Sequence, residues 1–161
     1  QYGTDDKQAL ERLTAAEDAL THRQNLAASD RDEERARILR VRAVRSQQAG
    51  LAEGAQAALN QLGELAAGNR DSVIQECWHG AAGEMLAAKG NFKEAVAELE
   101  EDQENPETLF WLARAYKETG ATDQARATED RLRTMNQASL EQVLATAALR
   151  ERANPAPVAA K

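Results

Sequence analysis

The sequence predicts an all-α fold, a stack of antiparallel helix hairpins with about eight helices, and three observations support it. First, a small residue, a turn glycine and a helix that carries Ala and Leu recur in this order, with the glycines at Gly50, Gly90 and Gly120. Glycines 40 and then 30 residues apart are typical of a helix–turn–helix unit that repeats and stacks as a solenoid. Second, alanine dominates the composition and aromatic residues make up only 4%, which favours helix throughout. Third, no stretch alternates polar and apolar residues for long enough to predict a strand.

The overall charge excludes several classes of function. The formal net charge is −7, whereas general nucleic-acid-binding domains usually carry a basic surplus, so we expect no nucleic-acid partner. An acidic chain is also a poor match for an anionic membrane, and no apolar run is long enough to span a bilayer. We therefore expect a soluble protein; no targeting segment is visible in the chain as given, and the compartment stays open. The first residue is Gln1 rather than Met, which we interpret as the start of a trimmed or excised piece.

The first three helices are expected over 5–28, 31–49 and 52–66. The first carries a helical stripe of Leu and Ala side chains. The polar stretch 29–32 offers N-cap oxygens to the second. The third is expected to stop at Gly68.

Two capping-box patterns predict the fourth and fifth helices, over 72–89 and 92–103. Each pattern pairs an N-cap residue with a Glu or Gln three positions later: Ser72 with Gln75, and Asn91 with Glu94.

The sixth helix begins at Asn105 and Pro106 and ends at Gly120. Proline suits the first turn of a helix because the N–H that it lacks would have no partner there. A seventh helix is expected over 122–135.

A third capping pattern, Ser139 with Gln142, opens an eighth helix that runs to about residue 152. No partner helix follows, so we expect the helix over 140–152 to cap the last repeat and shield its apolar face. The Pro- and Ala-rich stretch 153–161 is predicted to be a flexible tail.

Three segments share one residue pattern, in which small and large apolar residues flank a turn glycine. The pattern is carried by Leu39, Ala43, Gly50, Ala55, Leu59 and Leu62, then by Gly83, Leu86, Gly90, Phe92, Ala95 and Leu99, and then by Leu109, Leu112, Ala113, Tyr116, Gly120 and Ala125. It resembles the pattern of the tetratricopeptide repeat family. The resemblance implies a right-handed superhelical stack of helix hairpins, a tetratricopeptide-like α-solenoid.

The resemblance covers 36–139 as three degenerate repeats. These are expected over about 36–70, 71–105 and 106–139, after an N-terminal helix and linker over 1–35 and before the capping helix. The pattern departs from that of the family because the two tryptophans do not fall at the family's Trp position. A plain helical bundle is the alternative fold.

The resemblance also implies a non-catalytic protein–protein interaction module that binds a peptide or partner segment on its concave face. Projected onto this chain, that face takes residues from all three repeats: Arg37, Arg40, Val44, Cys77, Gly80, Glu84, Phe110, Arg114 and Lys117. Because arginine pairs bidentately with carboxylates, we expect a protein or peptide ligand with acidic groups. The alternative is that these arginines form a solvated helix face. The clamp of the chaperone-binding members is not found, since Val44 and Glu84 stand where polar clamp residues are expected.

Charge is unevenly distributed along the chain, which makes self-association an alternative function. Residues 31–50 contain six Arg and three acidic residues, whereas 71–107 contain ten acidic residues and two Lys. The arginine-rich helix of one copy could meet the acidic segment of another and build a self-assembling structural module of a larger protein. The simpler interpretation of the acidic run is a solvated helix end.

The sequence offers little for catalysis. Glu76 and His79 have the spacing of a di-metal helix motif, and with His22 they define a remote alternative, a metal-dependent enzyme. Such a site needs a second pair of ligands, and the chain has only two His. No Ser/His/Asp arrangement and no phosphate-binding loop is present. We therefore expect no enzyme, no metal and no cofactor, and the single cysteine, Cys77, cannot form an intrachain disulfide.

Overall fold

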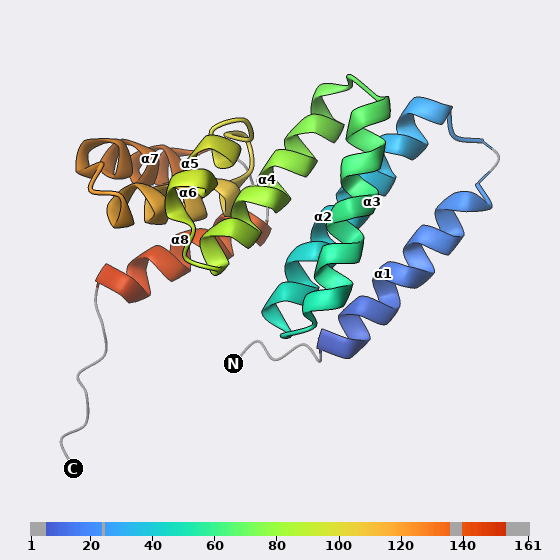
Figure 1. The fold of residues 1–161 in the computed structure, drawn as a ribbon, viewed down its shortest axis with the longest axis horizontal. Helices are drawn as coiled ribbons and strands as arrows, with labels where there is room; N and C mark the ends of the chain where they lie inside the picture. The colour runs from blue at the N-terminus through green and yellow to red at the C-terminus, as the bar shows by residue number, and fades with distance from the viewer. Residues whose placement is uncertain (1–5, 24, 136–139, 154–161) are drawn as a thin grey trace, which may run out of the picture. The chain divides into compact units, whose positions relative to one another are not determined.

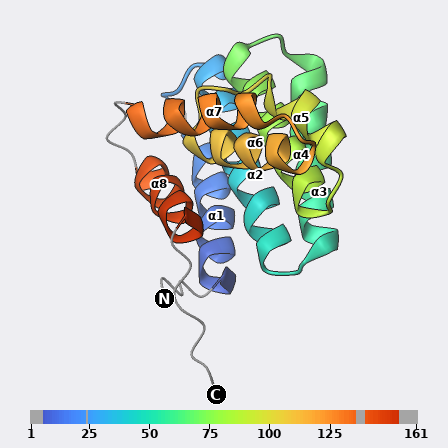
Figure 2. The ribbon, with the colours of Figure 1, turned by 90° about the vertical axis from the view of Figure 1, so that its left-hand side faces the viewer.

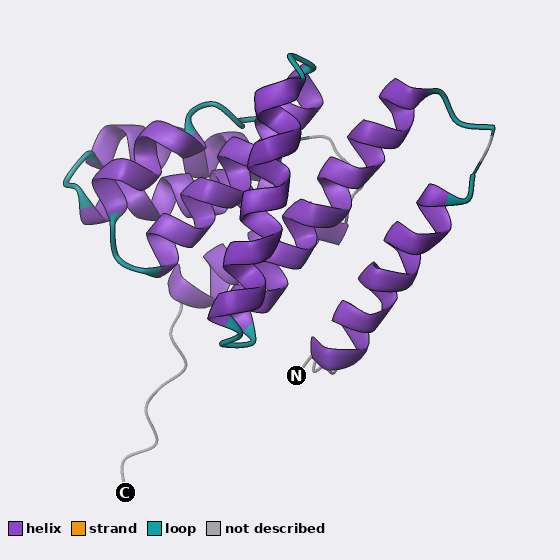
Figure 3. Cartoon of the chain, turned by 45° about the vertical axis from the view of Figure 1, so that its right-hand side comes forward, coloured by secondary structure: helices purple, strands orange, loops and turns teal. Residues whose placement is uncertain are grey.

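The computed structural model describes residues 6–23, 25–135 and 140–153. Within these ranges the chain forms eight helices and no strand (Figures 1 and 3). The helices are α1 (Asp6–Thr21), α2 (Ala28–Gln48), α3 (Ala52–Gly68), α4 (Ser72–Ala88), α5 (Phe92–Leu99), α6 (Pro106–Glu118), α7 (Thr122–Thr134) and α8 (Leu140–Ala153). The predicted all-α fold with about eight helices is confirmed.

The chain folds as two compact units, Gln1–Met85 and Leu86–Lys161, called unit 1 and unit 2 below. Unit 1 contains α1, α2, α3 and most of α4, and unit 2 contains the end of α4 and the helices from α5 to α8. The border falls inside α4, and therefore inside the second of the three predicted repeats.

The three turn glycines share one backbone geometry. Gly50, Gly90 and Gly120 have φ angles of 74°, 83° and 83°, a region that side chains with a Cβ rarely adopt. At each turn the residue after the glycine donates its N–H to the carbonyl five residues earlier, which closes the end of the preceding helix. These bonds join Leu51 to Ser46 (2.8 Å), Asn91 to Leu86 (3.0 Å) and Ala121 to Tyr116 (2.8 Å). The repeat seen in the sequence is therefore a repeat of local structure.

Unit 1 is built around the hairpin of α2 and α3, against which α4 packs. Small side chains let the helices approach, and leucine and isoleucine fill the space between them. One apolar cluster joins Ala36, Leu39, Leu62, Ala66, Ile74, Cys77 and Ala81, and another joins Ala43, Ala55, Ala58 and Met85.

The first helix, α1, is held to α2 largely by polar contacts. Only Leu20 of its residues is buried. Glu17 accepts from Arg35 at 3.4 Å and from Arg42 at 2.7 Å, and Arg42 also donates to Thr14 at 3.4 Å. Pairs between partly exposed charges each stabilise a fold by only about 0–1 kcal/mol, so α1 is a weakly attached edge of unit 1.

The connection between α1 and α2 differs from the prediction. α1 ends at Thr21 instead of continuing to residue 28, and α2 begins at Ala28, so the stretch 29–32 lies inside α2 and does not cap it. Arg31 explains the difference, because its guanidinium donates to the carbonyls of Arg23 and Leu26 at 3.2 and 3.3 Å. These bonds join Arg23 and Leu26 to the first turn of α2.

Unit 2 is built around the hairpins of α5 with α6 and of α6 with α7, and α8 packs against both α6 and α7 (Figure 2). One cluster joins Ala87, Ala95, Leu99, Leu112 and Ala115, with Phe92 and Trp111 packed against it. The other joins Leu109, Leu132, Ala145 and Leu149, the last two from α8.

The N-terminal cap of α4 differs from the prediction, whereas that of α6 agrees with it. Asp71, not Ser72, caps α4, because its Oδ1 accepts from the N–H groups of Val73 and Ile74 at 2.9 and 3.4 Å. Gln75 instead donates to two carbonyls at the end of α3. The predicted cap of α6 is confirmed: the Asn105 side chain accepts from the N–H groups of the second and third helical residues at 2.9 and 3.3 Å.

The fifth helix is shorter than predicted. It begins at Phe92 but ends at Leu99, not at residue 103, and the Asn91 side chain makes no capping hydrogen bond. Asp102 explains the early end: it is 2% exposed and accepts from the Thr108 hydroxyl at 2.6 Å. The tail was predicted over 153–161, but Ala153 belongs to α8, and the rest of that stretch, like Ser139, lies outside the described residues.

Candidate partner-binding site

The residues predicted to face a ligand fall into two groups, one in each compact unit. Unit 1 holds Arg37, Arg40, Val44, Cys77, Gly80 and Glu84, and unit 2 holds Phe110, Arg114 and Lys117.

In unit 1 most of the group lies inside the fold, which differs from the exposed face that we expected. Arg40 and Glu84 are 8% and 3% exposed, and Nη2 of Arg40 lies 3.0 Å from Oε1 of Glu84. Val44, Cys77 and Gly80 are buried as well. The physical reason is that α4 packs against α2 and brings Glu84 to Arg40, so this pair ties two helices together.

The other arginines of α2 are also engaged within unit 1. Arg37 pairs with Glu33 and Glu34 of its own helix at 3.1 and 2.7 Å. Glu17 of α1 forms ion pairs with Arg35 and Arg42 of α2. The basic surplus counted along the sequence is partly offset by Glu17 and Glu84, which the fold brings to α2. This weakens the case for self-association through this helix.

In unit 2 the three residues lie on one face of α6, because they are four and then three positions apart. Phe110 is half-buried, packs against the cluster formed with α8 and makes an edge-to-face contact with Trp111, with ring centroids 5.8 Å apart. Lys117 is exposed and pairs with Glu129 of α7.

Arg114 sits over two aromatic rings. Its guanidinium carbon lies 5.1 Å from the centre of the Trp111 ring and 5.8 Å from that of Phe92. Such cation–π contacts stabilise by about 0.5–1 kcal/mol when exposed and by more when water is excluded. Among the side chains that the structure describes, none forms a hydrogen bond or an ion pair with its N–H groups.

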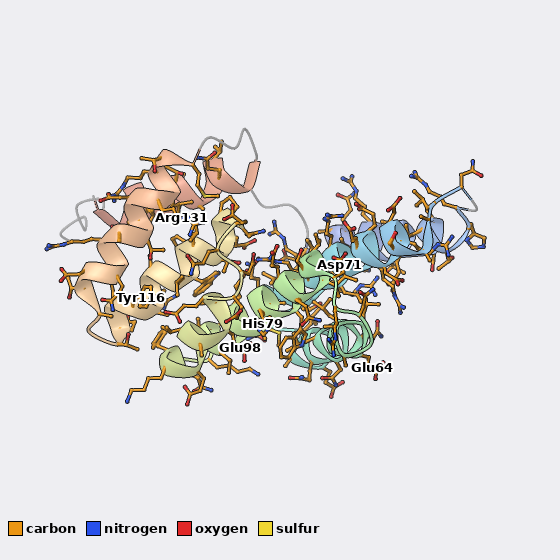
Figure 4. The ribbon with its side chains drawn as sticks, turned by 90° about the horizontal axis from the view of Figure 1, so that it is seen from above. Glu64, Asp71, His79, Glu98, Tyr116 and Arg131 are labelled. Carbon is orange, nitrogen blue, oxygen red and sulfur yellow. The ribbon has the colours of Figure 1, made fainter. Side chains whose placement is uncertain are left out.

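Arg131 of α7 is the natural comparison for Arg114, since both are half-buried in unit 2. Arg131 donates to Gln103 at 2.6 Å and to Glu104 at 2.7 Å. Figure 4 labels Arg131 on α7 and Tyr116 on α6. Arg114 differs from Arg131 because no described side chain accepts a hydrogen bond from its guanidinium.

Tyr116 fixes α6 to the residue that follows α5. Its O–H donates to Oε1 of Glu100 at 2.5 Å. Burial, followed by this hydrogen bond and the charge of Glu100, raises the pKa of Tyr116 to about 12. The phenol therefore stays protonated and keeps this contact at all ordinary pH values.

The aromatic support of Arg114 was missed by the sequence analysis. The positions of both aromatic residues are visible in the sequence. Trp111 precedes Arg114 by one helical turn, and Phe92 follows the turn glycine Gly90. The sequence could not show that the two rings meet at the same guanidinium.

The residues considered for metal chemistry do not assemble a site within the described part of the chain. No group of three or more His, Cys, Asp or Glu side chains in that part could hold a metal ion. His79, labelled in Figure 4, packs edge-on against Trp78, and Nδ1 of His22 lies 2.7 Å from the carbonyl of Asp18. No helix among the described residues is long and apolar enough to cross a membrane.

Comparison with known families agrees with the repeated turns and the stacked hairpins of unit 2. Residues 81–149 match the tetratricopeptide repeat family. This tetratricopeptide segment contains Gly90 and Gly120 and all of α5, α6 and α7, and it does not reach α1, α2 or α3. No curated protein and no solved structure matches the chain. Repeats of this family generally mediate protein–protein interaction and are typically non-catalytic.

Proposed function

We propose that this chain is a non-catalytic interaction module that binds a peptide or partner segment on the concave face of its tetratricopeptide-like helices, at α6. One observation carries the proposal: Phe110, Arg114 and Lys117 share a face of α6 inside the tetratricopeptide segment. This face combines an apolar ring with two cations, and aromatic and arginine side chains are enriched where proteins bind one another.

The group in unit 1 is left out of the proposed site. Arg40 and Val44 of α2 and Glu84 of α4 are buried where these two helices pack together. A ligand would have to separate α2 from α4 to reach them. Breaking a buried ion pair costs about 3–5 kcal/mol, which is more than most peptide contacts return.

The test is selection of peptides from a random displayed library, followed by amide chemical-shift mapping with the best synthetic peptide. The proposal predicts shifts concentrated between Phe110 and Lys117 on α6. Arg126→Glu, on the exposed side of α7, is the control variant and should bind the peptide as the wild type does. Shifts confined to α3 or to the exposed side of α7, or a library that yields no binder, would contradict the proposal.

Self-association stays a second prediction, although the pairing of the α2 arginines does not favour it. Sedimentation at low and high salt tests it, because association through opposite charges weakens as salt rises. A monomer at every protein concentration and at both salt levels would exclude it.

A further inference from the structure

We propose that Arg114 is the receptor for an aspartate or glutamate side chain of the bound segment; this inference rests on the proposed function of α6. Two half-buried arginines of unit 2, Arg114 and Arg131, differ in their partners. Arg131 is satisfied by Gln103 and Glu104, whereas no acidic side chain that the structure describes pairs with Arg114. A half-buried guanidinium without a counter-charge is complementary to an incoming carboxylate.

The two rings hold the guanidinium in place from elements that the fold itself fixes. Phe92 is the first residue of α5 and Trp111 lies in α6, and both pack against the apolar cluster between these helices. A guanidinium that lies over aromatic rings is attracted through its flat faces and keeps its N–H donors in its own plane. Those donors match the two oxygens of a carboxylate. Little rotamer freedom remains to be lost when a ligand binds, which favours affinity.

Two acidic side chains of unit 2 are engaged by groups other than Arg114. Glu100 accepts from Tyr116, and Glu104 accepts from Arg131. Glu118 follows Arg114 by one helical turn but forms no ion pair with it among the described contacts. Side chains of a helix lean toward its N-terminus, which agrees with Arg114 reaching back over Trp111 and away from Glu118.

The neighbours of Arg114 on α6 suggest the rest of the ligand. Phe110 lies one turn before Arg114, and its half-buried ring can contact an apolar side chain. The matched partner segment is therefore one in which an acidic side chain stands near an apolar one.

The experiment uses a random peptide library displayed at the N-terminus of a coat protein, so that no displayed peptide has a free terminal carboxylate. Wild-type chain, Arg114→Gln, Arg114→Lys and the control Arg126→Gln are each used for selection. We expect wild type and Arg126→Gln to enrich Asp and Glu next to an apolar residue. Arg114→Gln should lose this enrichment, and Arg114→Lys, which keeps the charge without the planar fork, should retain part of it.

The best acidic peptide is then synthesised together with its Glu→Gln or Asp→Asn counterpart. Wild type should bind the acidic peptide at least about tenfold more tightly, in line with a charged hydrogen bond, and Arg114→Gln should not distinguish the two. Equal affinity of wild type for both peptides, with shifts still on α6, would overturn the inference and leave the proposed function intact. Peptides that bind without any shift on α6 would overturn both. Circular dichroism of each variant checks that helicity is unchanged.

Discussion

Arg40 in unit 1 and Arg114 in unit 2 were predicted for the same role, and the fold uses them differently. Arg40 is 8% exposed and bonded to Glu84 at 3.0 Å, so its charge serves to join α2 to α4. Arg114 is half-buried over Phe92 and Trp111 and pairs with no acidic side chain that the structure describes. The difference teaches that an arginine on a predicted binding face is available to a partner only where the fold supplies no carboxylate.

The largest expected effect breaks the Arg40 side of this comparison. Glu84→Ala should lower the free energy of unfolding by about 3 kcal/mol, because Arg40 loses this carboxylate while it remains inside unit 1. Arg114→Met should change it by no more than about 1 kcal/mol, since only cation–π contacts are lost.

Urea denaturation of the variants measures both values. The double variant Arg40→Leu with Glu84→Leu is the control. Its loss of stability should be smaller than the sum of the losses measured for Arg40→Leu and Glu84→Leu alone. Equal losses for Glu84→Ala and Arg114→Met would contradict the contrast between the two arginines.

The next effect concerns the turn glycines with positive φ angles, which both units contain. Gly50→Ala in unit 1 and Gly120→Ala in unit 2 should each cost about 1–2 kcal/mol, because both glycines have φ angles that strain a residue with a Cβ. Gly54→Ala is the matched control, since the added Cβ would meet nothing closer than the Ser46 Oγ at 3.5 Å. It should stabilise α3 by about 0.5 kcal/mol. Thermal unfolding followed by circular dichroism distinguishes the expected loss of stability in Gly50→Ala and Gly120→Ala from the expected gain in Gly54→Ala.

A smaller effect is expected from the hydrogen bond between Tyr116 and Glu100 in unit 2. Tyr116→Phe should cost about 1 kcal/mol near neutral pH through loss of the hydrogen bond to Glu100. The pKa of Tyr116 is raised from 10.0 to about 12, so the folded state holds the phenol proton more tightly than the unfolded state. The resulting stability is fully present below pH 10 and is lost as the pH rises toward about 12.

Unfolding curves measured between neutral pH and the alkaline range, for wild type and Tyr116→Phe, check this sign. The difference in stability between the two proteins should shrink as the pH rises through that window. A difference that grows instead would show that the phenolate is favoured in the fold.

The smallest effect concerns the α1 edge of unit 1. Glu17→Gln should cost about 0.5 kcal/mol at low salt and less at high salt, because Arg35 and Arg42 pair with it near the surface. Urea unfolding at two salt levels measures it. A loss that does not change with salt would mean that packing, not charge, attaches α1.

The turns and most helices of this fold could be predicted because their signals are local. Gly50, Gly90 and Gly120 each mark a left-handed turn, and Asn105 caps α6 as its neighbours predict. Where two neighbouring residues can both cap a helix, the sequence does not show which of them does. Asp71 caps α4, although Ser72 was expected to do so. The early end of α5 depends on a buried hydrogen bond of Asp102, which lies outside the helix pattern.

The candidate site could be predicted only in part, because its features depend on distant residues. Arg40 and Glu84 are 44 positions apart, so nothing local indicates that they pair. The face of α6 follows from the helical spacing of Phe110, Arg114 and Lys117. Only the fold brings Phe92 of α5 to that face.

The most direct test of the account is a titration with the best library-selected acidic peptide, followed through the Nε–Hε signals of the arginine side chains. We expect the Arg114 signal to shift and saturate with binding, while the signal of Arg40 stays in place. A shift at Arg40, or saturation of binding without any change at Arg114, would contradict it.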